Sequence, residues 1–324
     1  MPLSQIIGGL RGLWRAWSWF WFRPVSASGA GIMRILMGVM LVMTTIDLFP
    51  ELELLVGPDG VHSASAAAKG VRMGRWTWFD QVDSMQAVTA IHCATLVVNL
   101  LFLLGFKSRT MGILSVMAHA ALYQRNGWFM NGGDRLVREF TLYLSLVPCG
   151  AAYSVDAWLK RRREAWPSSP LIPILAHRLI QIQLCVMYAA SGWDKYVTGS
   201  WKSGHALYFA LSSENYQRSS ELVHPLVGTE WGQGFLQVGT AITLYWELGF
   251  ALLVLWRPTR WLALIMGVLI HAGIHVTMLV AFFSAASVWG YLSFLPYDWV
   301  ERTQDWWRRW RVGRPRGDAS AIGG

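Results

Sequence analysis

The sequence predicts an all-α integral membrane protein, a bundle of about eight transmembrane helices preceded by an N-terminal interfacial helix. Of its 324 residues, 54% are hydrophobic and only 15% are charged, whereas about a quarter of the residues of a typical soluble domain are charged. Many of the 20 tryptophans sit beside apolar runs, as in the aromatic belts of membrane proteins. Apolar runs of about 20 residues, long enough to span a bilayer, recur along the chain. This pattern excludes a disordered chain, a coiled coil and an ordinary cytosolic enzyme.

Each predicted span is a mostly apolar run. The eight runs cover residues 30–49, 85–105, 108–124, 137–155, 176–196, 234–255, 260–280 and 282–298. Residues 1–29 form an interfacial segment, because the stretch from Trp14 to Phe22 mixes aromatic and basic residues but is too short to span. We therefore divide the chain into this segment, a transmembrane domain at 30–298 and a basic cytoplasmic tail at 299–324.

The distribution of Lys and Arg predicts a multi-pass protein of the cell membrane with both termini in the cytoplasm. Basic residues concentrate in the N-terminal segment, in the run 160–163 and in the tail, and cytoplasmic connections carry such an excess. The long connections 50–84 and 197–233 then lie outside the cell, where loops of this length usually carry function or cover a cavity. Because topology explains the net charge of +9, we expect membrane lipids as partners and no nucleic acid.

Ionisable residues at membrane depth are candidates for function, because they are costly to bury in a bilayer. They are Arg34, His92, His119, Glu139, Lys195, Glu247, His271 and His275. With a rise of about 1.5 Å per residue, Glu247 and His271 fall near the midplane. His275 falls about one turn further out, and Lys195 falls at the outer end of its span. The sequence thus predicts that these groups line one cavity open to the outside.

Each candidate also has a structural interpretation. His271 and His275 share a helix face, but H-x-x-x-H without a neighbouring glutamate is a weak metal signature, so we expect interhelical hydrogen bonds and no metal. Glu247 is either a proton carrier or metal ligand, or a carboxylate that ties two helices together, for example through Arg34. Lys195 either snorkels to the interface or is a desolvated general base.

The segment that opens the fourth predicted span from outside has two interpretations as well. It reads NGGDRLVRE, from Asn131 to Glu139. Asp134 near the helix start complements the helix dipole, and the glycines allow a ligand to approach the backbone closely. Both interpretations stay open.

Three stretches together resemble the vitamin K-dependent gamma-carboxylase and the wider bacterial family built on its membrane domain, the HTTM family. They are NGGDRLVREFTLYLSLVPCGAAYSVDAW at 131–158, RLIQIQLCVMYAASGWDKYVTGSWKSGHALYFAL at 178–211, and LIHAGIHVTMLVAFFSAASVWGYLSFLP at 269–296. The stretch DLFPELELLVGPDGV at 47–61 is also similar to the family's first loop. The second stretch is the most specific, and the resemblance covers essentially the whole chain.

The resemblance implies a membrane-embedded, lyase-type enzyme that uses a quinol, either vitamin K hydroquinone or menaquinol. Lys195 matches the lysine that deprotonates the quinol, and His271 matches the carboxylase histidine better than its competitor His275. With Glu247, these residues would form the catalytic centre. Cofactor contacts are expected from Asn131, Tyr188, Trp201 and His275.

Two departures from the carboxylase leave the activity open. The region that should carry a histidine reads Asn131-Gly132-Gly133-Asp134, and the large lumenal domain has no counterpart in the predicted tail. The chain is similar in size to the bacterial membrane protein that matures the sporulation-delaying toxin, which also lacks that domain. Maturation of a small exported peptide is therefore one expectation, and a non-catalytic partner that holds or exports such a peptide is the alternative. A transporter with Glu247 and His271 as a proton relay is a third, although no inverted repeat supports it.

Overall fold

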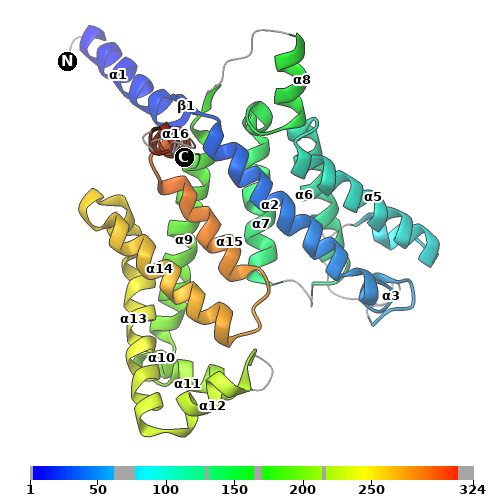
Figure 1. The fold of residues 1–324 in the computed structure, drawn as a ribbon, viewed down its shortest axis with the longest axis vertical. Helices are drawn as coiled ribbons and strands as arrows, with labels where there is room; N and C mark the ends of the chain where they lie inside the picture. Colours follow the sequence, from blue (N-terminus) through cyan, green and yellow to red (C-terminus); the bar gives the residue numbers. More distant parts are fainter. Residues whose placement is uncertain (1–2, 62–76, 128–130, 164–169, 214–216, 313–324) are drawn as a thin grey trace, which may run out of the picture.

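The computed structural model describes residues 3–61, 77–127, 131–163, 170–213 and 217–312, and this part of the chain is mostly helical (Figure 1). Its α-helices are α1 (Leu3–Phe22), α2 (Ser28–Asp47), α3 (Leu52–Val56), α5 (Met85–Leu104), α6 (Ser108–Arg125), α7 (Gly132–Ser145), α8 (Val155–Arg163), α9 (Leu175–Val197), α10 (Gly199–Lys202), α11 (Ala206–Ser212), α12 (Ser220–Gly228), α13 (Glu230–Leu255), α14 (Arg257–Thr277), α15 (Phe283–Gly290) and α16 (Trp299–Val312). The 3₁₀ helices are η1 (Phe49–Glu51), η2 (Trp78–Gln81), η3 (Cys149–Ala151) and η4 (Tyr291–Phe294). The strands β1 (Pro24–Ser26) and β2 (Leu171–Pro173) pair antiparallel, with Val25 opposite Ile172.

Four helical segments of the described chain are long and apolar enough to cross a membrane. They are Ser28–Val56, Met85–Leu104, Glu230–Leu255 and Arg257–Thr277. These segments coincide with the predicted spans 30–49, 85–105, 234–255 and 260–280. The mostly helical fold is therefore confirmed, with these four segments as candidate membrane spans.

The other four predicted spans are helical but are not among these candidates. α6 and α9 have 18 and 23 residues, whereas α7 has 14 and α15 has only 8. The predicted span 137–155 is interrupted near Pro148, and a proline removes a backbone donor and disfavours helix at the preceding residue. α15 is likewise followed by η4 and not by more α-helix. The count of eight spans stays a prediction.

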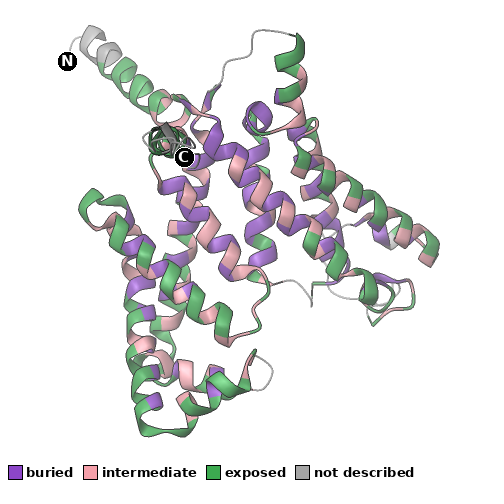
Figure 2. Cartoon of the chain, in the orientation of Figure 1, coloured by how far each residue is buried: buried purple, intermediate pink, exposed green. Residues whose placement is uncertain are grey.

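The core lies where α2, α7, α9 and α15 meet, and Figure 2 shows buried residues concentrated on these helices. Arg34 of α2 is fully buried there and donates hydrogen bonds to backbone oxygens of Phe102 (2.8 Å), Leu103 (2.5 Å) and Tyr153 (2.6 Å). It therefore joins α2 to the end of α5 and to the segment before α8. Arg34 does not pair with Glu247, so the sequence-based pairing of these two residues is wrong.

Three basic elements lie at one end of the molecule, which is the upper end in Figure 1. They are α1, α8 and α16, and both ends of the described chain lie there too. Glu301 of α16 accepts hydrogen bonds from the hydroxyls of Ser26 (2.5 Å) and Ser28 (2.6 Å), which ties α16 to the start of α2. Helix α9 runs from this end toward the opposite one, where α10, α11 and α12 lie. This arrangement agrees with the predicted positive-inside orientation, which stays a prediction, and residues 313–324 of the predicted tail are outside the described chain.

Candidate functional site

Lys195 lies in the last turn of α9, and its ammonium group is held inside the protein. Nζ donates hydrogen bonds to Ser191 Oγ at 2.6 Å and to Glu247 Oε2 of α13 at 2.7 Å. It also lies 5.1 Å from the ring centre of Trp201. The side chains of Lys195 and Glu247 are only 22% and 11% exposed. A snorkelling lysine would place its charge in water, so the geometry favours a desolvated, ion-paired lysine.

A buried hydrogen-bonded chain of aromatic groups lies next to this ion pair. The hydroxyl of Tyr188 on α9 is 2.7 Å from Nε2 of His271 on α14 and 2.7 Å from the hydroxyl of Tyr291. All three side chains are nearly inaccessible to solvent. Because a hydroxyl has one proton, Tyr188 donates to one of these partners and accepts from the other. His271 thus makes the interhelical hydrogen bond that the sequence predicts.

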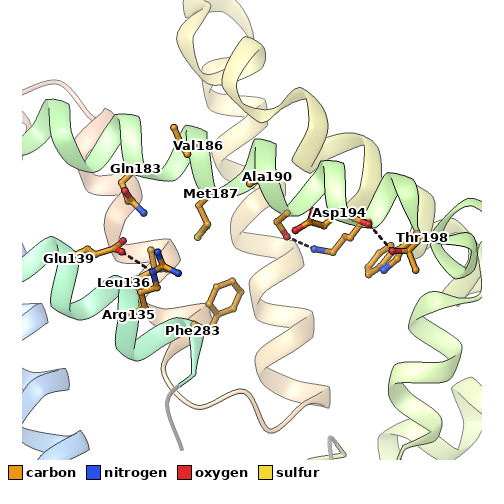
Figure 3. A pocket seen from close by; sticks show the side chains of 14 residues that line it. Arg135, Leu136, Glu139, Gln183, Val186, Met187, Ala190, Asp194, Thr198 and Phe283 are labelled. Carbon is orange, nitrogen blue, oxygen red and sulfur yellow. Dashed lines mark hydrogen bonds and ion pairs between the residues drawn. The ribbon is translucent and has the colours of Figure 1, made fainter. Parts of the chain in front are cut away.

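Two cavities meet at Lys195. The first, of about 500 Å³, lies between α9, α13 and α14 and is bordered by α11 and α12, with an almost entirely apolar lining. The second, of about 550 Å³, lies between α7 and α9 and is lined by charged and polar side chains as well as apolar ones (Figure 3). We name them the apolar cavity and the polar pocket. Their shared wall consists of Met187, Ser191, Lys195, Trp201 and Phe283.

The comparison with known families agrees with this architecture. A family model described as the HTTM domain matches residues 22–299. The chain belongs to the HTTM family. This domain is the membrane domain of vitamin K-dependent carboxylase-like proteins, so the resemblance drawn from the sequence is confirmed at the level of the family, and the chain is a membrane protein. Neither a curated protein nor a solved structure matches the sequence.

The HTTM fold brings some of the predicted site residues together. Lys195, Glu247, Tyr188 and Trp201 all line the apolar cavity, and His271 joins them through its hydrogen bond to Tyr188. These five residues therefore lie in one site, and their catalytic and cofactor-binding roles remain predictions.

Two residues predicted to contact the cofactor, Asn131 and His275, do not line the apolar cavity. Asn131 is the N-cap of α7, where its Oδ1 accepts hydrogen bonds from the backbone of Gly133 (2.8 Å) and Asp134 (3.1 Å), and Nδ2 donates to the Asp134 carboxylate (2.7 Å). This capping box occupies both ends of the Asn131 amide. His275 is exposed on α14, one turn beyond the buried His271. A cofactor contact of either residue stays a prediction.

Three further candidates belong to other parts of the protein. Arg34 binds backbone carbonyls, as described above. His92 Nε2 lies 2.8 Å from the backbone oxygen of Thr45, and His119 Nε2 lies 3.1 Å from the amide of Asn99, all between α2, α5 and α6. The expectation that one cavity collects every ionisable group is therefore wrong. Polar groups at membrane depth also serve to join helices.

Two members of the site were not predicted from the sequence. Ser191 precedes Lys195 by four residues and hence shares its helix face, a signal that could have found it. Tyr291 belongs to η4, and no spacing rule in the sequence links it to Tyr188, which is 103 positions away.

We expect Tyr188→Phe to cost more stability than Tyr291→Phe. The first change leaves both His271 Nε2 and the Tyr291 hydroxyl without their partner, whereas the second keeps the bond between Tyr188 and His271. A buried hydrogen bond contributes about 1 kcal/mol net, so the free energy of unfolding should fall by about 2 and about 1 kcal/mol. Thermal and denaturant unfolding in detergent would measure both values. Equal losses would contradict the central place of Tyr188.

Proposed function

We propose that this HTTM protein is a membrane-embedded enzyme that takes a proton from a quinol-type lipid and uses the reaction to modify or mature an exported peptide. The observation that carries the proposal is the desolvated Lys195–Glu247 pair at the edge of an apolar cavity. Small-molecule sites are typically apolar pockets with a few convergent polar or charged groups.

The apolar cavity suits a quinol. Its volume of about 500 Å³ falls in the range of small-molecule sites, which are mostly apolar with a few polar groups. Aliphatic and aromatic side chains such as Phe235, Leu236 and Ile270 line its walls, and the Lys195–Glu247 pair is the charged group among them. Lys195, Glu247 and Tyr188 would hold the polar head. When bound, a quinol would supply an acidic hydroxyl group, and its oxidation by molecular oxygen to the epoxide and water would drive the modification of the peptide.

The ion pair sets how Lys195 can act as a base. An ammonium group has no lone pair, so Nζ accepts a proton only as it gives up the one that it shares with Glu247 Oε2, 2.7 Å away. Transfer to Nζ and transfer from Nζ to Oε2 therefore occur together, and the pair gains one proton in total. Ser191 Oγ, at 2.6 Å, orients the amine during this exchange.

A quinol assay in proteoliposomes tests the proposal. Wild type, Lys195→Ala and the control Lys202→Ala would receive reduced menaquinone or vitamin K hydroquinone under oxygen, and epoxide would be measured by mass spectrometry. Lys202 lies seven residues further on, and its ammonium group is 4.6 Å from the Tyr196 ring centre. We expect epoxide from wild type and Lys202→Ala but a loss of at least about a hundredfold in Lys195→Ala, within the usual contribution of a general base.

Equal turnover of wild type and Lys195→Ala would refute Lys195 as the base. No epoxide from folded wild type would refute the quinol reaction and favour the non-catalytic peptide partner.

A further inference from the structure

The polar pocket contains a positively charged and a negatively charged side chain, Arg135 and Asp194, that do not belong to the Lys195–Glu247 ion pair. Arg135 of α7 donates from Nε to Glu139 Oε1 at 3.0 Å, and its side chain is 66% exposed. Among the described residues no partner contacts its terminal nitrogens. These two nitrogens present a planar pair of donors to the pocket, a geometry that matches phosphate and carboxylate oxygens.

One carboxylate of the same pocket also lacks a partner within the described chain. The Asp194 carboxylate is exposed in the pocket, and the bond between Asp194 and Thr198 uses the backbone oxygen of Asp194 as its acceptor, which leaves the carboxylate open. Such an acceptor suits a group with N–H donors, and a primary ammonium has three.

The exposed face of α9 leads from apolar residues to this pocket. Ile182, Val186, Ala190 and Asp194 follow one another at intervals of four, so they lie on one helix face. Ile182 and Val186 are 41% and 58% exposed, and Val186, Ala190 and Asp194 line the polar pocket, as Figure 3 shows. An acyl chain on this stripe would therefore end at the charged groups.

We infer that the polar pocket binds a phospholipid whose head group carries a phosphate and a primary ammonium, as in phosphatidylethanolamine. Arg135 holds the phosphate, Asp194 receives the ammonium, and the acyl chains lie along Ile182 and Val186. The apolar cavity takes no part, so this inference does not depend on the proposed function.

The charges of the pocket select among lipids. Lys195 is paired with Glu247 and Arg135 with Glu139, which leaves the Asp194 carboxylate, so a head group with net negative charge gains less here than a zwitterion does. A phosphatidylcholine head is zwitterionic too, but its quaternary nitrogen has no N–H to donate. A site built to bond N–H groups discriminates strongly against an analogue without them. Phosphatidylethanolamine should therefore be preferred to both phosphatidylglycerol and phosphatidylcholine.

Native mass spectrometry of the purified full chain in detergent tests this order. Phosphatidylethanolamine, phosphatidylcholine and phosphatidylglycerol with identical acyl chains would be titrated separately, with free phosphoethanolamine as a fourth probe. We expect wild type to retain phosphatidylethanolamine about tenfold more tightly than the other lipids, the effect of one or two charged hydrogen bonds. Free phosphoethanolamine should bind far more weakly, because it lacks acyl chains.

Three variants assign the contacts. Asp194→Asn should lower the affinity for phosphatidylethanolamine to that for phosphatidylcholine, and Arg135→Gln should weaken both. Arg138→Gln is the matched control, since the Arg138 guanidinium lies 5.4 Å from the Tyr123 ring centre and outside the pocket lining, and it should match wild type. Equal retention of all three lipids, or no change in Asp194→Asn, would overturn the inference. Tight binding of free phosphoethanolamine would assign the pocket to a soluble ligand instead.

Discussion

Replacing Lys195 alone or Glu247 alone is expected to destabilise the protein far more than replacing both. Lys195→Met removes the cation beside Glu247, whose side chain is 11% exposed, and Glu247→Leu removes the anion beside Lys195, whose side chain is 22% exposed. Removing one member of a buried ion pair typically costs about 3–5 kcal/mol, whereas exchanging both for apolar residues is often neutral. Since this pair keeps some solvent contact, we expect about 3 kcal/mol for each single variant and about 1 kcal/mol or less for the double variant.

The measurement is the free energy of unfolding of the four proteins in the same detergent, arranged as a double-mutant cycle. The double variant also separates structure from chemistry, because it should unfold like wild type and yet produce no epoxide in the quinol assay. Additive losses would show that the two side chains act independently in the membrane. Recovery of turnover in the double variant would show that the ion pair is structural only.

The sequence predicted which charged groups lie in this region better than it predicted their contacts. Lys195 and Glu247 were both singled out, because charges at membrane depth are rare. A rise of about 1.5 Å per residue places each group at a height along its helix, but it says nothing about the rotation of one helix against another. The sequence therefore suggested Arg34 as a partner for Glu247. In the structure Lys195 pairs with Glu247, and Arg34 donates to three backbone carbonyls.

For the fold as well, the sequence predicted local features but not long-range contacts. Apolar runs alone located α2, α5, α13 and α14, because length and composition are local properties. They did not show that α7 ends at Ser145 or that α15 ends at Gly290. Nor could they separate the polar groups of the Lys195 site from His92 and His119, which join α2, α5 and α6 through contacts 47 and 20 positions apart in the sequence.

Gly192→Ala is expected to disturb the site strongly, although it adds only one methyl group. A Cβ atom at Gly192 would lie 2.8 Å from the backbone nitrogen of Leu248 and 3.1 Å from the carbonyl carbon of Glu247. These are backbone atoms of α13, so no side-chain rotation relieves the contact, and α9 and α13 must move apart. Overpacking of this kind costs about 1–3 kcal/mol.

Gly249→Ala on α13 is the matched control, because its Cβ would meet only the side chain of Leu253 at 3.6 Å. That is an ordinary contact, and alanine is the better helix former by about 1 kcal/mol in soluble hosts, so this variant should be as stable as wild type or more so. Unfolding in detergent and epoxide formation would be measured for both. Equal stability of the two variants would contradict the close crossing at Gly192. Lys195 lies one turn from Gly192 and contacts Glu247 across the same helix crossing. Low turnover of folded Gly192→Ala with normal turnover of Gly249→Ala would therefore show that the reaction depends on the spacing of α9 and α13.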